Sequence, residues 1–187
     1  TKQPDSTGDT TEDNREILPE EPSQHAVAKD FNEAAFRCQL IKHEGYRKVV
    51  YKDSEGLATG GIGHLLRTPT ETTRYPIGSP LSEEQVEAWY REDSVIAIRG
   101  ATSLVGAEQW ERLSDVRKRA LADLCYNLGK PRMSKFVKFL AAVKAEDWRT
   151  AGQELENSKW YGQVKARGPK IVTMITNNTD PNGCDKG

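Results

Sequence analysis

Apolar residues begin to recur at helical spacing at residue 31. The apolar positions three or four residues apart in the segment that follows are Phe31, Ala34, Ala35, Cys38 and Ile41. This spacing is typical of a helix with one buried face. Asp30 and Glu33 have the spacing of a capping box, so we expect the helix to begin at Asp30. Gly45, directly after Glu44, predicts where the helix ends.

The pattern changes to short strands after the first helix. Residues 48–52 predict a strand, residues 53–56 a turn, and residues 57–59 the returning strand. A glycine-rich run follows at residues 60–63, where the backbone bends or passes close to another group. Together these elements predict a small antiparallel β-lobe.

Helical spacing returns after Ser82 and continues almost to the end of the chain. Ser82 and Gln85 form a second capping box, and a long helix is expected from about Ser82 to about Gly100. One face of this helix is expected to carry Val86, Trp89, Ile96 and Ala97. Further helices are expected over residues 114–129, 136–143, 148–155 and 169–175. The fold class is therefore α+β, with the helices in the larger part.

The first 29 residues differ in composition from the rest. They are rich in Thr, Asp, Glu, Pro and Ser and have almost no apolar spacing, so we expect a flexible acidic linker or tail. Residues 177–187 are expected to form a C-terminal tail. The first five residues contain no apolar core, so no signal peptide is expected in this chain, and because no Met opens it we expect a fragment, a processed product or an excised domain.

Charge and hydropathy exclude some classes of protein. No apolar run approaches the length of a membrane span, so no membrane insertion is expected. Residues 1–30 carry 3 basic and 8 acidic side chains, whereas residues 31–187 carry 24 basic and 20 acidic ones. The mildly cationic folded part would suit a polyanion such as a bacterial wall or a nucleic acid, although ordinary surface charge explains it equally well.

The three cysteines, Cys38, Cys125 and Cys184, form neither a close pair nor a metal-binding spacing. Two of them lie among apolar residues in helical patterns, where a free cysteine behaves as a small hydrophobic residue. We therefore expect all three to be reduced and structural. A Cys38–Cys125 bridge stays an alternative that nothing in the sequence supports.

Two carboxyl groups are candidates for acid–base chemistry. Glu44 ends the first helix, and the unpaired carbonyls of a helix end disfavour an anion, so Glu44 should keep its proton or pair with a cation. Asp53 begins a turn with access to water and should stay ionised. A glycosidase needs two carboxyls in such different environments. Acidic residues at helix ends and turns usually just face solvent, so this pattern alone is weak.

Other catalytic motifs are missing from the sequence. The glycine-rich run has no Gly-Lys-Ser/Thr after it and is not a phosphate loop. No serine or cysteine stands in a nucleophile motif. The tryptophans, including Trp110, Trp148 and Trp160, are expected to fill the core. No cofactor and no metal are implied.

The residues around both carboxyls resemble the catalytic region of the T-even phage lysozymes, glycoside hydrolase family twenty-four. The spacing Glu-x8-Asp-x5-Thr is reproduced by Glu44, Asp53 and Thr59, and Gly-Ile-Gly-His-Leu-Leu ends the match at residues 61–66. Similar segments continue over residues 95–100, 117–129, 157–161 and 167–172. The resemblance covers residues 31 to 176 and implies a lysozyme-like α+β fold over residues 30–176, with a cleft between two lobes joined by the long helix.

The resemblance also implies roles for individual residues. Glu44 is expected to be the general acid, Asp53 the catalytic aspartate and Thr59 the residue that positions water. Leu65 and Tyr126 are expected to line the cleft and contact substrate. Three other residues are expected to support the site structurally: Arg167 would hold Glu44, and His64 and Asp93 would form an ion pair. Two positions depart from the family pattern: Gly60 stands where the family has a bulkier residue, and Glu154 stands where the family has a neutral one.

The implied activity is inverting hydrolysis of the bond between N-acetylmuramic acid and N-acetylglucosamine in bacterial peptidoglycan. Peptidoglycan is the expected partner, and a nucleic acid is not. A lytic transglycosylase, or a non-catalytic wall-binding module of a virion, stays an alternative. The acidic linker favours a domain of a larger virion protein over a free endolysin. The expected location is the phage virion or the host periplasm and cell wall.

Overall fold

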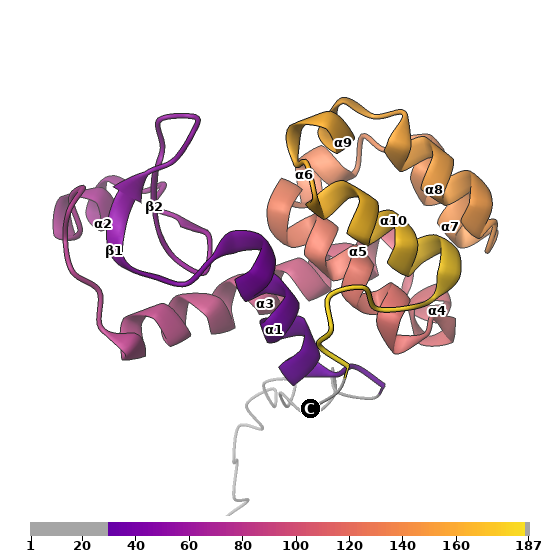
Figure 1. Cartoon of the computed structure of the whole chain (residues 1–187), viewed down its shortest axis with the longest axis horizontal. Coiled ribbons are helices and arrows are strands. Elements are labelled where there is room, and N and C mark those ends of the chain that lie inside the picture. Colours follow the sequence, from indigo (N-terminus) through magenta and orange to yellow (C-terminus); the bar gives the residue numbers. More distant parts are fainter. Residues whose placement is uncertain (1–29, 186–187) are drawn as a thin grey trace, which may run out of the picture.

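A computed structural model describes residues 30–185 as two lobes (Figure 1). The predicted linker of residues 1–29 lies outside the described residues. The first helix and the sheet are α1 (Glu33–Glu44), β1 (Arg47–Lys52), β2 (Ala58–Gly61) and β3 (His64–Leu65). The long connecting helix is α3 (Glu83–Val105), preceded by the short α2 (Pro69–Arg74). The remaining helices are α4 (Ala107–Arg112), α5 (Asp115–Leu128), α6 (Lys130–Met133), α7 (Val137–Lys144), α8 (Trp148–Glu156), α9 (Lys159–Gln163) and α10 (Arg167–Asn177). The expected α+β class is confirmed.

The small lobe is an antiparallel sheet in the order β1-β2-β3. Its β1 and β2 form the predicted hairpin, with β2 running two residues further into the glycine-rich run than expected. The short β3 and α2 were not predicted, and neither were the short helices α4, α6 and α9 of the other lobe, because elements of six residues or fewer carry too little periodicity to detect. In Figure 1, α3 runs from beneath this lobe into the helical lobe.

The helical lobe is built around α5, which is buried along most of its length. It packs against α3 and α10, and α10 packs in turn against α8 (Figure 1). The fully buried apolar side chains at these contacts include Leu121, Leu124, Leu155, Ile171 and Ile175. Trp110 and Trp160 are buried as expected, whereas Ile96, placed on the buried face of α3 by its spacing, is 67% exposed.

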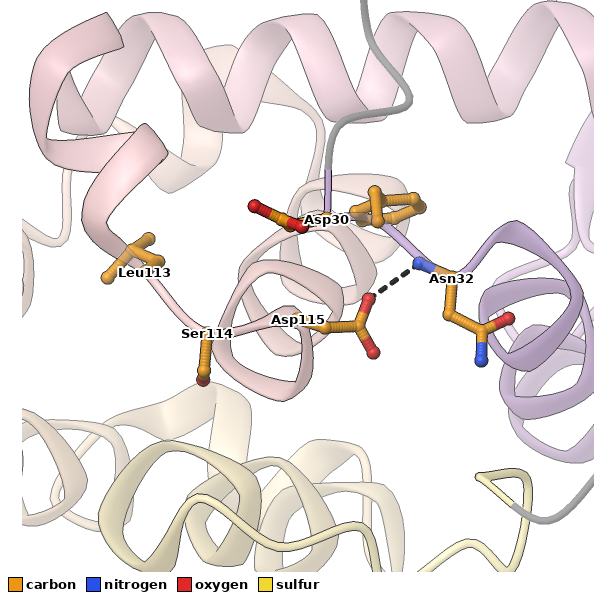
Figure 2. Close-up of a pocket in the computed structure, with 6 residues that line it drawn as sticks. Asp30, Asn32, Leu113, Ser114 and Asp115 are labelled. Carbon is orange, nitrogen blue, oxygen red and sulfur yellow. Dashed lines mark hydrogen bonds between the residues drawn. The ribbon is translucent and has the colours of Figure 1, made fainter.

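The helix caps correct one prediction and support three. The side chain of Asn32, not Asp30, caps α1 by accepting a hydrogen bond from the Ala35 N–H at 3.0 Å. Asn32 also donates its own N–H to Asp115 at 2.6 Å, which joins the start of α1 to the first turn of α5 (Figure 2). Ser82 and Ser114 cap α3 and α5, and Gly129 ends α5, as expected.

The cysteine prediction is wrong. Cys38 of α1 forms a disulfide with Cys184, 146 residues away, and only Cys125 is free among the described cysteines. The segment after α10, residues 178–185, is loop-like but packs against the helical lobe, with Asn182 and Cys184 buried. The buried Arg119 of α5 donates to Asp180 of this segment at 2.9 Å. The disulfide joins this segment to α1, and the ion pair joins it to α5.

No helix within residues 30–185 has the length and apolar character that crossing a membrane requires.

Candidate active site

Glu44 is the last residue of α1, and its carboxylate is paired with a cation. Gly45, at a φ of 82°, ends the helix and donates its N–H to the Ile41 carbonyl at 2.8 Å. Arg167, from the start of α10, donates from Nη1 to Oε1 of Glu44 at 2.6 Å. The side chain of Glu44 is 18% exposed and that of Arg167 is 7% exposed. Of the two states expected for Glu44 at a helix end, the structure has the one with a cationic partner.

Arg167 is itself held by Asp123, a buried residue of α5 that the sequence did not suggest for the site. The guanidinium donates from Nε and Nη2 to Oδ1 of Asp123 at 2.9 and 2.6 Å. Burial alone would raise the pKa of Asp123, but the charge of Arg167 and the hydrogen bond with His43 outweigh burial and hold this pKa at about 2. Burial alone would likewise lower the pKa of Arg167, but the carboxylates of Asp123 and Glu44 raise it. Arg167 therefore stays charged beside Glu44.

The turn between β2 and β3 lies directly against the Glu44 carboxylate. Gly63 has a φ of 64°, and a Cβ placed on it would lie 2.5 Å from Oε2 of Glu44. Any larger residue would collide with the carboxylate, which explains one glycine of the run. Tyr126 of α5 donates its hydroxyl to the Ile62 carbonyl in the same turn. The turn is thereby tied to the helical lobe.

Asp53 and Thr59 lie together on the β1–β2 hairpin. Oδ1 of Asp53 accepts the N–H groups of Glu55 and Leu57 at 2.9 and 2.8 Å, which fixes the carboxylate in the turn. The Thr59 hydroxyl is 3.4 Å from Oδ2 of Asp53. Thr59 is buried on the central strand, where it pairs with Tyr51 on one side and Leu65 on the other. The hairpin thus presents one carboxylate oxygen and one hydroxyl as neighbours.

His64 lies between two carboxylates rather than one. Nδ1 is 2.7 Å from Asp93, the expected partner, and Nε2 is 3.0 Å from Glu71 of α2. Glu71 was missed because α2 was missed. The ring stacks on Trp89 with centroids 4.3 Å apart. Because both nitrogens face oxygen acceptors, the geometry fits the doubly protonated ring.

The pH dependence of stability should report the charge on His64. Burial alone would lower the pKa of His64, but the hydrogen bonds and charges of Asp93 and Glu71 outweigh it and raise this pKa above 6.5. A raised pKa in the folded state gives stabilisation that is complete below pH 6.5 and is lost as pH rises through the folded-state pKa. Thermal melts between pH 5 and 9 should therefore show the wild type losing more stability above pH 6.5 than His64→Gln. Equal slopes for the two proteins would contradict this assignment.

The site lies within a segment that matches a known protein family. A family model described as phage lysozyme matches residues 41–174, which include all eight sequence-predicted site residues. The chain belongs to the phage lysozyme family. As a lysozyme it is a glycoside hydrolase that degrades peptidoglycan.

Curated relatives of this lysozyme fall into two kinds. Probable T4-type lysozyme 2 of Dictyostelium discoideum is 28% identical over 163 residues, which cover 78% of this chain and 96% of that protein. Probable T4-type lysozyme 1 of the same organism is 24% identical over 166 residues, with the same two coverages. The pre-baseplate central spike protein Gp5 of Enterobacteria phage T4 is 26% identical over 187 residues, which cover 90% of this chain but only 32% of that protein.

Proposed function

We propose that the lysozyme is an N-acetylmuramidase that cleaves the β-1,4 bond between N-acetylmuramic acid and N-acetylglucosamine by acid/base hydrolysis. The observation that carries the proposal is the difference between its two carboxyl groups. Glu44 is partly buried and bonded to Arg167, whereas Asp53 is fixed by two backbone N–H groups of its turn. Such a pair suits one acid and one carboxylate that assists water.

Glu44 acts as the general acid. Its Oε1 accepts a hydrogen bond from Arg167, so Oε2 is the oxygen better able to carry a proton. In the reactive form this proton passes from Oε2 to the glycosidic oxygen as the bond to the muramic acid C1 breaks. Arg167 fixes the carboxyl plane throughout, which is the orientation that proton transfer requires.

Asp53 and Thr59 act on the attacking water. Oδ2 of Asp53 and the Thr59 hydroxyl are close enough to bind one water molecule between them. Asp53 takes a proton from this water as its oxygen attacks C1 on the face opposite the leaving group. The product sugar is then inverted at C1. Leu65, the strand neighbour of Thr59, and Tyr126, bonded to the turn beside Glu44, would contact the glycan.

Two rival functions predict different products. A lytic transglycosylase needs only the acid and releases 1,6-anhydro ends, whereas a non-catalytic wall-binding module releases nothing. The neighbouring Asp53 and Thr59 favour hydrolysis, because neither rival needs a water-binding pair. Purified protein should clear a suspension of peptidoglycan, and mass spectrometry of the soluble muropeptides should find reducing muramic acid ends, each one water heavier than the anhydro form. Anhydro ends would support the transglycosylase, and binding without clearing would support the module.

We also propose that the lysozyme is a domain of a larger virion protein that opens the wall during infection. The central spike protein Gp5, of which the chain matches about a third, supports this setting. An antibody raised against residues 30–185 should detect a band in purified virions that is larger than this chain. A signal found only in lysates, at the size of this chain, would instead support a free endolysin.

A further inference from the structure

The hydrogen bonds that hold Glu44 continue beyond Arg167 to the C-terminal segment. Asp123, which binds Arg167 through Oδ1, lies 2.7 Å from Nδ1 of His43 through Oδ2. Nε2 of His43 lies 2.9 Å from Oδ1 of Asn182. A chain of four side chains from α10, α5, α1 and residues 178–185 therefore ends on the carboxylate of Glu44. We call Arg167, Asp123, His43 and Asn182 the positioning array.

Both nitrogens of His43 face oxygen atoms, so the ring fits the array as a cation. Asp123 can only accept at one nitrogen, since its carboxylate is ionised. At the other, the amide of Asn182 is oriented by its Nδ2, which donates to Asp180 at 2.8 Å and leaves Oδ1 for His43. The array thus alternates in charge: His43 positive, Asp123 negative and Arg167 positive, next to the acid.

The array is buried, so its charges act strongly on Glu44. The side chains of His43, Asp123 and Arg167 are 3%, 0% and 7% exposed. Burying charges costs more free energy than packing apolar residues of similar size, so an ionic array in the core is a poor way to gain stability. Tyr126, which also has an electrostatic interaction with Glu44, stays neutral because burial raises its pKa.

The C-terminal segment is held in place independently of the array. The Cys38–Cys184 disulfide ties it to α1, and Lys42 donates to the Asn182 carbonyl. These two contacts hold the backbone of the segment where the Asn182 amide can bond with His43.

We propose that His43 and Asp123 are positioning residues for Glu44, and that Asn182 makes the C-terminal segment part of the catalytic apparatus. The inference rests on the proposed function, because the array can affect catalysis through Glu44 only if Glu44 is the general acid. With all members in place the array presents one net positive charge to Glu44 through a fixed guanidinium. Without His43 the charges of Asp123 and Arg167 cancel, and Glu44 faces a neutral pair.

The test is the alkaline limb of the pH–activity profile, where Glu44 loses the proton that it must donate. His43→Gln should move this limb to higher pH by on the order of one pH unit, because it removes a buried positive charge near Glu44. It should also lower kcat roughly tenfold with little change in KM. Adding Asp123→Asn to His43→Gln restores the net positive charge and should return the limb to its wild-type position or below. Reversal by a second change in the core is not expected of residues that only stabilise the fold.

Asn182→Ala tests the part played by the C-terminal segment. It removes the acceptor for the second proton of His43, so the limb should move in the same direction as in His43→Gln, but less. Asp185→Asn is the matched control, because Asp185 lies in the same segment and is bonded to Arg119, outside the array, so the limb and kcat of this variant should stay near wild type. If His43→Gln does not fold, the comparison of Asn182→Ala with Asp185→Asn tests the inference instead.

The inference is overturned if the folded His43→Gln and Asn182→Ala variants keep the wild-type limb and kcat. Glu44→Gln, measured in parallel, separates this failure from that of the proposed function. If Glu44→Gln loses activity while the array variants show no shift of the alkaline limb, only the proposed role of the array is contradicted. Full activity in Glu44→Gln removes the proposed function itself.

Discussion

Glu44→Gln is expected to lower the rate of wall clearing by roughly 10³-fold while the protein stays folded. Glutamine has almost the shape of glutamate and can still accept the hydrogen bond from Arg167, but it has no acidic proton to donate. General acid catalysis contributes on the order of 10²–10⁴ in rate, and Glu44 is the group proposed to supply it. The measurement is turbidity clearing by matched amounts of protein, with circular dichroism as the check on folding.

Glu84→Gln is the control for this substitution. Glu84 is exposed in the first turn of α3, so the variant loses the same charge away from the site. It should clear the wall at close to the wild-type rate. Near-wild-type clearing by Glu44→Gln would remove Glu44 from the reaction.

Arg167→Met is expected to lower the free energy of unfolding by about 3–5 kcal/mol. The substitution leaves Asp123, whose side chain is 0% exposed, without the cation that binds its Oδ1. Oδ2 of Asp123 keeps its bonds with His43 and Gln39, but the loss of both donors to the buried Oδ1 costs more than the methionine gains by packing. Urea unfolding followed by fluorescence measures the difference.

A second substitution should recover part of this loss. In Arg167→Met with Asp123→Asn the carboxylate that lost its guanidinium partner is itself removed, so the double variant should be more stable than the sum of the two single changes predicts. Arg99→Met, on the exposed face of α3, should change stability by no more than about 0.5 kcal/mol. Additive effects of the two core substitutions would show that Arg167 and Asp123 are not coupled.

Local sequence signals were enough for most of the fold. Helical spacing, Ser82, Ser114 and Gly129 identified the start of α3 and both ends of α5, because caps and apolar faces depend on residues a few positions apart. The end of α3 expected at about Gly100 was wrong: the helix continues to Val105, and Gly100 instead allows close packing against Cys125. The same method misjudged Ile96, since a residue at the edge of an apolar stripe can face solvent. It chose Asp30 over Asn32 because these two residues, on either side of Phe31, offer the same capping chemistry.

Long-range contacts of the site were harder to predict. The position of Asp53 at a predicted turn made it a candidate, and the family resemblance supplied Thr59 and Arg167, the partner of Glu44. Asp123, Glu71 and the Cys38–Cys184 disulfide went unnoticed, because each depends on segments that only the fold brings together. One signal was present: Asp123 interrupts the apolar face of α5, and a buried carboxylate requires a partner.

The most direct test of two-carboxyl hydrolysis is the configuration of the new sugar end. Proton NMR can follow a soluble glycan of alternating N-acetylglucosamine and N-acetylmuramic acid during the first minutes after enzyme is added, before the anomers interconvert. We predict that the α-anomer of the reducing muramic acid appears first, because water directed by Asp53 attacks opposite the bond that Glu44 protonates. First appearance of the β-anomer, or of a 1,6-anhydro end, would contradict this mechanism.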